Sequence, residues 1–318
     1  MVRGFLETIV RFGDSRPGLF GRCKAYYGTV EAQGRGTLHL HMVLWLEGNP
    51  NPQRLRDRML SDPRFRGRVF EWLEDIIRCE LPGTEAIHKG DPESMRKPET
   101  ESVGDPRVCA VPLRSEFCDS TESEAIFETN FEEVVRSLAI SCNWHDHTET
   151  CWKHLKPDQP RDSAHCRMRH TGAVRERTEL DKETQSIMLR RLHPWINNYN
   201  DIMLYLLKCN MDIKYVGSGE AAKALTYYIT DYITKPSLPT HAALAAVCAA
   251  IRKTSKTAGH DGDRQQFRRS LLTKIVNGIM GKIELSYAQV MSYLVGGGDH
   301  YSSHTFRNLN WSMLDKFV

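Results

Sequence analysis

Residues 24–46 read KAYYGTVEAQGRGTLHLHMVLWL, and the pattern within this stretch decides the fold that we predict. In 38–46, Leu and Met alternate with His, Val and Trp, which is the period of a half-buried β-strand. A second strand is predicted over 24–33. The Gly34–Gly36 turn that joins the two strands predicts a β-hairpin.

His39 and His41 lie two residues apart in the second of these strands, so their side chains point to the same face. Their Cβ atoms are then roughly 7 Å apart, which lets two imidazoles reach one ion. The alternative is that both histidines are half-exposed residues on a polar face.

Glu31 and Gln33 share one face of the facing strand, and the hairpin turn brings Glu31 into range of the two histidines. Two imidazoles and one carboxylate or amide suit Mg²⁺ or Mn²⁺ and leave coordination positions open for a substrate. The alternative for Glu31 is a surface contact with Arg35 across the strands.

Tyr228 and Tyr232 lie four residues apart in a helix predicted over 219–235, so they share one helix face about 6 Å apart. Tyrosine is a covalent nucleophile in some enzymes, and Lys235 lies near the same face, where it would lower a phenol pKa or contact phosphate. The alternative is that these are aromatic packing residues at helical spacing. Tyr227 points about 100° away and is expected to pack.

Six residues with zinc-binding side chains lie close together in the segment 142–180. They are Cys142, His145, His147, Cys151, Cys166 and His170. Their spacing suits a tetrahedral structural zinc site, but it does not choose four ligands from the six. The alternative is a coincidental cluster.

The composition excludes several classes of protein. The sequence holds nine cysteines, an odd number, and it has no secretory signal, so we predict an intracellular chain without disulfides. No apolar run approaches the roughly 20 residues that cross a bilayer. The run GIMGKIE at 278–284 has neither the spacing nor the hydroxyl of a phosphate loop, so no ATPase or helicase is predicted. An arginine-rich stretch at 161–177 is compatible with phosphate contact.

The rest of the chain is predicted to mix helices with short strands. Helices are predicted over 53–81, 124–143, 241–253 and 263–283, and strands over 187–189, 302–314 and twice within 201–217. Residues 82–125 are rich in Pro, Gly, Ser and Glu and are predicted to be a mobile insertion. We divide the chain into four segments: the hairpin and helix 1–81, the variable insertion and helix 82–141, the Cys/His segment 142–180, and the part 181–318 with the tyrosine helix.

Four motifs, in this order, resemble one known family. They are YYGTVEAQGRGTLHLHMVLWL (26–46), HDHTETC and HCR (145–167), IKYVGSGEAAKALTYYITDYITK (213–235) and LSYAQVMSYLVGGGDHYSSHTFRNLNW (285–311). The family is the Helitron helicase-like N-terminal domain, the replication-initiator (Rep) nuclease of rolling-circle transposons, in the HUH endonuclease superfamily.

The resemblance implies an α+β fold: a mainly antiparallel β-sheet of HUH/Rep type with flanking helices and a Cys/His zinc-binding insertion. It implies that His39 and His41, on a central strand, bind Mg²⁺ or Mn²⁺, with Glu31 as our choice of third ligand. Tyr228 and Tyr232 would be the nucleophiles, on a helix laid across the sheet. In the Cys/His segment, the positions that match the family's zinc ligands are His145, His147, Cys151 and Cys166.

The implied activity is nicking and strand transfer on single-stranded DNA in the nucleus, through a 5′-phosphotyrosine. Asp231 stands between the tyrosines where relatives carry a basic residue, which we expect to weaken phosphate binding there. Relatives also have an upstream strand and a downstream helicase, so we expect this chain to be a fragment. The alternatives are an inactive remnant that retains only single-stranded DNA or zinc binding, and a zinc-organised interaction module.

Overall fold

The computed structural model describes residues 1–32, 37–83, 95–98, 107–108, 121–217, 219–234, 240–257, 264–282 and 287–305. The chain divides into two compact units. The first unit comprises Met1–Cys23 and Leu46–Thr226, and the second comprises Lys24–Trp45 and Tyr227–Val318. The predicted hairpin turn and most of the predicted insertion lie outside the described residues. The division into four segments stays a prediction.

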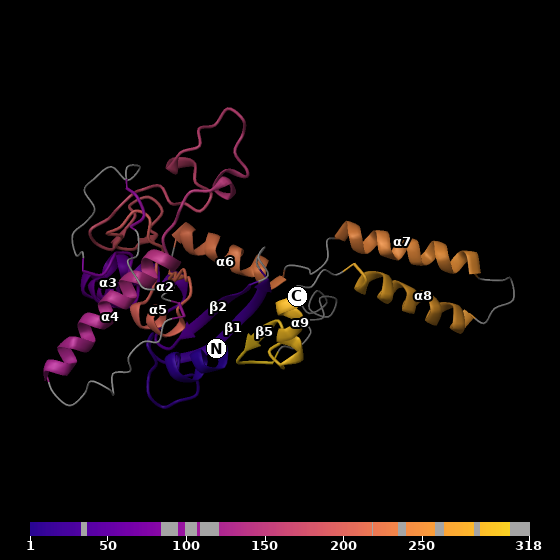
Figure 1. Ribbon diagram of the computed structural model, residues 1–318, viewed down its shortest axis with the longest axis horizontal. Helices are drawn as coiled ribbons and strands as arrows, with labels where there is room; N and C mark the ends of the chain where they lie inside the picture. The colour runs from indigo at the N-terminus through magenta and orange to yellow at the C-terminus, as the bar shows by residue number, and fades with distance from the viewer. Residues whose placement is uncertain are drawn as a thin grey trace. The chain divides into compact units, whose positions relative to one another are not determined.

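The first unit is mainly helical (Figure 1). Its elements are α1 (Val2–Gly4), η1 (Phe5–Ile9), α2 (Pro52–Ser61), α3 (Pro63–Ile76), α4 (Thr121–Cys142), η4 (Glu149–Trp152), η5 (Ser163–His165), β3 (Glu179–Leu180), β4 (Ile187–Met188), α5 (Asp201–Leu207) and the N-terminal half of α6 (Gly219–Thr234), whose C-terminal half belongs to the second unit. Strands β3 and β4 form a two-stranded antiparallel sheet.

The single helix predicted over 53–81 is wrong, because Pro63 divides it into α2 and α3. Asp62, the residue before this proline, is extended, with φ −119° and ψ 94°, since the proline ring disfavours a helical conformation there. The Asp62 side chain instead caps α3 by accepting a hydrogen bond from the Phe65 N–H. Helix α3 then ends at Ile76, earlier than predicted.

The core of the first unit lies where α4 packs against α5. Val135, Leu138 and Ala139 of α4 are almost fully buried against Leu204 of α5. The rings of Phe131 and Tyr205 lie 4.8 Å apart at the edge of this cluster. Apolar residues three and four apart along α4 give it the stripe that a helix needs to cover a neighbour.

The two short strands predicted within 201–217 are also wrong. Residues 201–207 form α5, which begins at Asn200, whose side chain accepts a hydrogen bond from the Met203 N–H. It ends where Lys208 turns into the left-handed region, with φ 49°. The irregular chain after α5 is held by buried asparagines instead of strand pairing: Asn143 donates to the Met211 carbonyl and accepts from its N–H.

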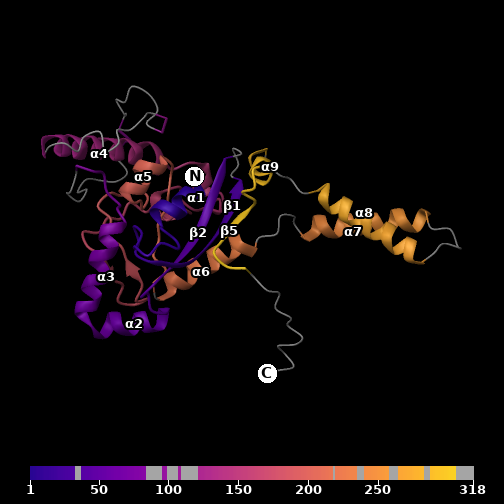
Figure 2. The ribbon, with the colours of Figure 1, turned by 90° about the horizontal axis from the view of Figure 1, so that it is seen from below.

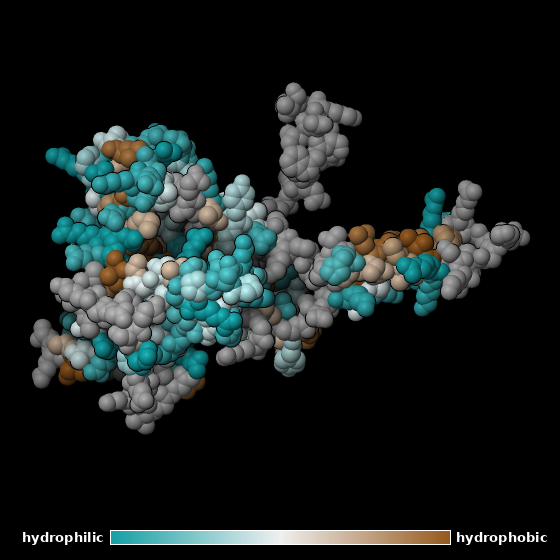
Figure 3. Space-filling view, turned by 90° about the horizontal axis from the view of Figure 1, so that it is seen from above, coloured by the Kyte–Doolittle hydropathy of each residue, from teal (hydrophilic) through white to brown (hydrophobic). Residues whose placement is uncertain are grey.

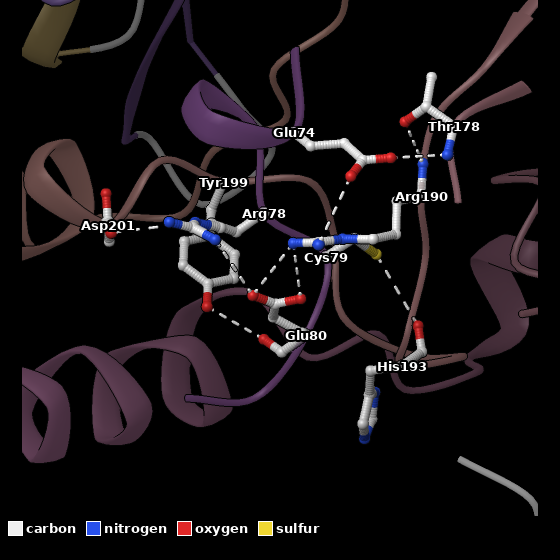
Figure 4. A network of polar contacts seen from close by, with 9 residues as sticks. All are labelled: Glu74, Arg78, Cys79, Glu80, Thr178, Arg190, His193, Tyr199 and Asp201. Atoms are coloured by element: carbon white, nitrogen blue, oxygen red, sulfur yellow. Dashed lines mark hydrogen bonds and ion pairs between the residues drawn. The ribbon is translucent and has the colours of Figure 1, made fainter. Parts of the chain in front are cut away.

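A network of ion pairs ties the chain after α3 to the segment after β4 (Figure 4). Arg190 contacts Glu80 at 3.2 Å and Glu74 at 3.6 Å, and Arg78 contacts Glu80 at 3.5 Å. The Tyr199 hydroxyl donates to the Glu80 carbonyl, and burial of this phenol raises the pKa of Tyr199. Glu80 is therefore the shared acceptor that holds two arginines.

We predict that Glu80→Gln lowers the free energy of unfolding by about 2 kcal/mol, because two arginines lose a charged partner that is only 17% exposed. The matched control is Glu47→Gln, since Glu47 pairs with Arg22 at 3.3 Å but is 52% exposed. Exposed pairs contribute little, so the control should change stability by less than about 1 kcal/mol. Urea unfolding of both variants checks this, and equal losses would contradict it.

The second unit contains a three-stranded sheet in the order β2-β1-β5 (Figure 2). Its strands are β1 (Cys23–Ala32), β2 (Leu38–Leu46) and β5 (His300–Ser302), and its further helices are α7 (Thr240–Thr257), α8 (Arg264–Met280) and α9 (Tyr287–Leu294). The two predicted hairpin strands are confirmed. Among the described strands, however, β2 is an edge strand and not the central one that we expected. Of the final strand predicted over 302–314, the structure describes residues 302–305, and only Ser302 among them is strand, at the end of β5. The rest of this prediction lies outside the described residues.

The chain therefore has the predicted α+β class, with small antiparallel sheets. Gly28 lets β1 and β2 approach closely, since a Cβ there would lie 3.0 Å from the Met42 side chain and 3.1 Å from the His41 carbonyl oxygen.

Helices α7 and α8 pack side by side, yet Leu272 and Met280 of α8 stay exposed, and Figure 3 shows hydrophobic surface along this pair. No helix in the described part of the chain is long and apolar enough to span a bilayer.

Candidate functional site

Strand β2 places His39 and His41 next to each other, as the alternation predicts. Their ring centroids lie 4.7 Å apart with an interplanar angle of 72°. The Nε2 atom of His41 lies 3.5 Å from a carboxylate oxygen of Glu31 on β1, and the His41 side chain is only 13% exposed. The structure thus brings together the three residues predicted for the divalent cation.

Helix α6 brings Tyr228 to this group. The ring centroid of Tyr228 lies 6.1 Å from that of His41, with an interplanar angle of 73°, and Tyr228 is 48% exposed. Tyr232 lies on α6 as predicted, but its side chain and the whole of Gln33 and Lys235 lie outside what the structure describes. The expectation that Tyr227 packs is wrong, because it is 78% exposed.

The donor set of His39, His41 and Glu31 fits a divalent cation in its chemistry, with two imidazole nitrogens and a carboxylate oxygen. Its ligand atoms do not converge as closely as those of a formed metal site. Within the described residues, one group of His, Cys, Asp and Glu side chains does converge in this way, and it lies in the first unit.

That group, which we call the Cys/His group, consists of His145, His147, Cys151 and Cys166. Its ligand atoms all lie within 4.8 Å of one another, so the group could hold a metal ion. His145 is at the centre, with its Nε2 atom 3.4 Å from the Cys166 sulfur and 3.6 Å from the Cys151 sulfur. These are the four positions that the resemblance implies.

Burial favours the uncharged form of these side chains. It lowers the pKa of His145 to about 3, with further lowering by His170 and His147, so the imidazole is neutral and its nitrogen can bind. Burial also raises the pKa of the Cys166 thiol, and the nearby Cys151 thiol raises it further. A divalent cation would therefore have to displace the thiol proton and would offset the charge that forms.

Neighbouring side chains orient the Cys/His group. The Nδ1 atom of His147 lies 3.2 Å from His145 Nε2, and its Nε2 atom lies 2.9 Å from the Ser163 hydroxyl oxygen. His170 stacks on His145 with a centroid distance of 4.1 Å. Such contacts fix ring orientation in metal sites. The sequence analysis missed Ser163 because no spacing pattern marks a hydroxyl that acts only through another residue.

Residues 1–44 match the family model described as the Helitron helicase-like domain at the N-terminus. No curated protein and no solved structure matches the chain. The matched segment contains β1 and the part of β2 that carries His39 and His41, and it suggests a transposon-related function. The match supports the resemblance to the Helitron helicase-like N-terminal domain in the segment that carries the histidine pair.

Proposed function

We propose that the chain is a DNA nicking and strand-transfer module of HUH/Rep type from a Helitron-like transposon, acting on single-stranded DNA in the nucleus. The observation that carries the proposal is the contact between His41 and Tyr228, at 6.1 Å between ring centroids. The two residues come from distant parts of the sequence, and both belong to the second unit. A metal-ligand pair beside a partly exposed phenol is the arrangement that tyrosine-dependent phosphoryl transfer needs.

In this proposal His39, His41 and Glu31 hold a Mg²⁺ or Mn²⁺ ion. When bound, that ion would neutralise charge on the scissile phosphate. The Tyr228 oxygen attacks phosphorus, a phenol oxygen–phosphorus bond forms, and the bond from phosphorus to the 3′ oxygen breaks. The phenol loses a proton and the 3′ oxygen gains one, which leaves a 5′-phosphotyrosine and a 3′-hydroxyl. The energy of the phosphodiester bond is kept in the adduct, so rejoining the strands needs no external energy source. Tyr232 is a second nucleophile, which would cut a second strand before the first is released.

The Cys/His group is proposed to bind Zn²⁺ as a structural ion, because two sulfurs and two imidazole nitrogens suit tetrahedral zinc. Asp231 favours a second candidate function, which is single-stranded DNA binding without cleavage. This carboxylate is exposed on α6 between the two tyrosines and repels phosphate.

We predict that the protein, incubated with labelled single-stranded DNA and Mn²⁺, forms a DNA adduct that survives denaturation. The double variant Tyr228→Phe with Tyr232→Phe should form none, because it lacks both nucleophilic oxygens. The matched control is Tyr227→Phe, which removes the hydroxyl of the neighbouring, more exposed tyrosine and should leave adduct formation unchanged. No adduct from the wild type, or an equal adduct from the double variant, would refute the nicking function; DNA binding that persists without any adduct would favour the second candidate.

A further inference from the structure

An aromatic pair lies on the same sheet face as the candidate cation ligands. Tyr27 of β1 and His300 of β5 have ring centroids 6.1 Å apart and an interplanar angle of 20°, so the rings are stacked. The register of the sheet places His300 opposite Thr29 and Ser302 opposite Tyr27. Because side chains alternate along a strand, Tyr27, Thr29 and Glu31 share one face of β1, and His300 shares it with them.

The orientation of His300 is held from the other side of its ring. Its Nδ1 atom lies 2.7 Å from a carboxylate oxygen of Asp299. The hydrogen bond from His300 and a second one from the Tyr293 hydroxyl lower the pKa of Asp299, so this carboxylate stays ionised and accepts both. The Asp299 carbonyl also accepts the Val30 N–H at 2.7 Å, which fixes the turn before β5 to β1.

The imidazole is therefore fixed in position but not covered. The His300 side chain is 56% exposed, while Tyr27 beneath it is half-buried in the sheet. Neighbouring strands lie about 4.8 Å apart, so β5 lies roughly 10 Å from β2 and its histidine pair. A nucleotide that flanks a phosphate at His41 can reach across that distance.

We propose that Tyr27 and His300 form a stacking platform for a base of single-stranded DNA that flanks the phosphate bound at His39 and His41. The inference rests on the proposed function for its substrate class. Proteins that bind single strands stack bases on exposed aromatic rings, and each such contact contributes to affinity whatever the base. Asp299 is a positioning residue in this arrangement, since it holds His300 through Nδ1. The alternative is that Tyr27 and His300 only stabilise the turn between α9 and β5. In that case, replacing either residue would not change how much the bases contribute to DNA affinity.

The test compares two probes with equal numbers of phosphates: oligothymidylate, and an oligomer of the same length made only of abasic nucleotides. The wild type should bind oligothymidylate more tightly, because base stacking adds to phosphate contact. His300→Ala and Tyr27→Ala should each weaken binding of oligothymidylate about 10-fold and leave binding of the abasic oligomer unchanged. His300→Phe and Tyr27→Phe are the matched controls, because they keep a ring and should bind like the wild type.

Equal affinity of the wild type for the two probes would overturn the proposal. So would an alanine variant that loses affinity for both probes equally, or a phenylalanine variant that loses as much as its alanine counterpart. The binding test is independent of the nicking function, because binding is measured without Mn²⁺ and needs no adduct. A platform effect without any adduct would leave the platform standing and remove the nicking function.

Discussion

Replacing Cys151 and Cys166 together by serine is expected to reduce the zinc content from about one ion per chain to none. Both sulfurs lie within 3.6 Å of His145 Nε2, so the double variant loses half of the ligand set at once. Structural zinc contributes on the order of 10 kcal/mol in zinc-finger peptides, which exceeds what a single side chain contributes to folding. The first unit should therefore unfold at a clearly lower temperature.

The measurement is metal analysis of the purified protein together with thermal unfolding, with and without a chelator. The matched control is the double variant Cys142→Ser with Cys248→Ser, since these cysteines lie outside the Cys/His group and Cys248 is exposed on α7. Chelation should lower the unfolding temperature of the wild type and of this control, but not that of the Cys151 and Cys166 variant. Protons compete with zinc for the sulfurs, so zinc affinity should fall as the pH falls. Equal zinc in the two double variants would contradict the site.

A candidate metal site in this segment could be predicted from sequence, but spacing alone could not say which of its side chains lie together. Six Cys and His side chains at short spacings indicate a metal site, and spacing leaves every combination of four open. The path of the chain decides among them: η4 begins at Glu149 and places Cys151 facing His145, and η5 brings Cys166 back to the same point. The resemblance to the Helitron domain supplied what the spacing could not.

For the fold, too, local features could be predicted from the sequence and non-local ones could not. Strands β1 and β2 were predicted because alternation is a local property that the sequence displays directly. The first two residues of β5 were not predicted as strand, since a three-residue strand carries little pattern and its pairing is non-local: Tyr26 and Ser303, which hydrogen-bond next to it, are 277 residues apart. His300 was missed as a candidate for the same reason. Helix α5 was predicted as strand because a short apolar run fits either element, and its Asn200 cap decides between them.

Replacing both His39 and His41 by alanine is expected to lower the rate of adduct formation by at least about 1,000-fold, because a metal ion supplies several kcal/mol of charge stabilisation in phosphoryl transfer. The matched control is His154→Ala with His241→Ala, which removes two exposed histidines that lie outside both candidate sites. Zinc content and unfolding temperature should be unchanged in the first variant, since its histidines lie in the second unit and not in the Cys/His group.

The single variant His39→Ala separates metal binding from a structural role. With His41 and Glu31 still in place, it should retain a weakened cation site, so a higher Mn²⁺ concentration should restore most of the maximal rate. Loss of the Tyr228 and Tyr232 hydroxyls should not be restored at any Mn²⁺ concentration, because the bond to phosphorus cannot form without them. If the His39→Ala rate stays low at every Mn²⁺ concentration while the variant remains folded, His39 does not act through the cation, and the paired imidazoles of β2 have another role.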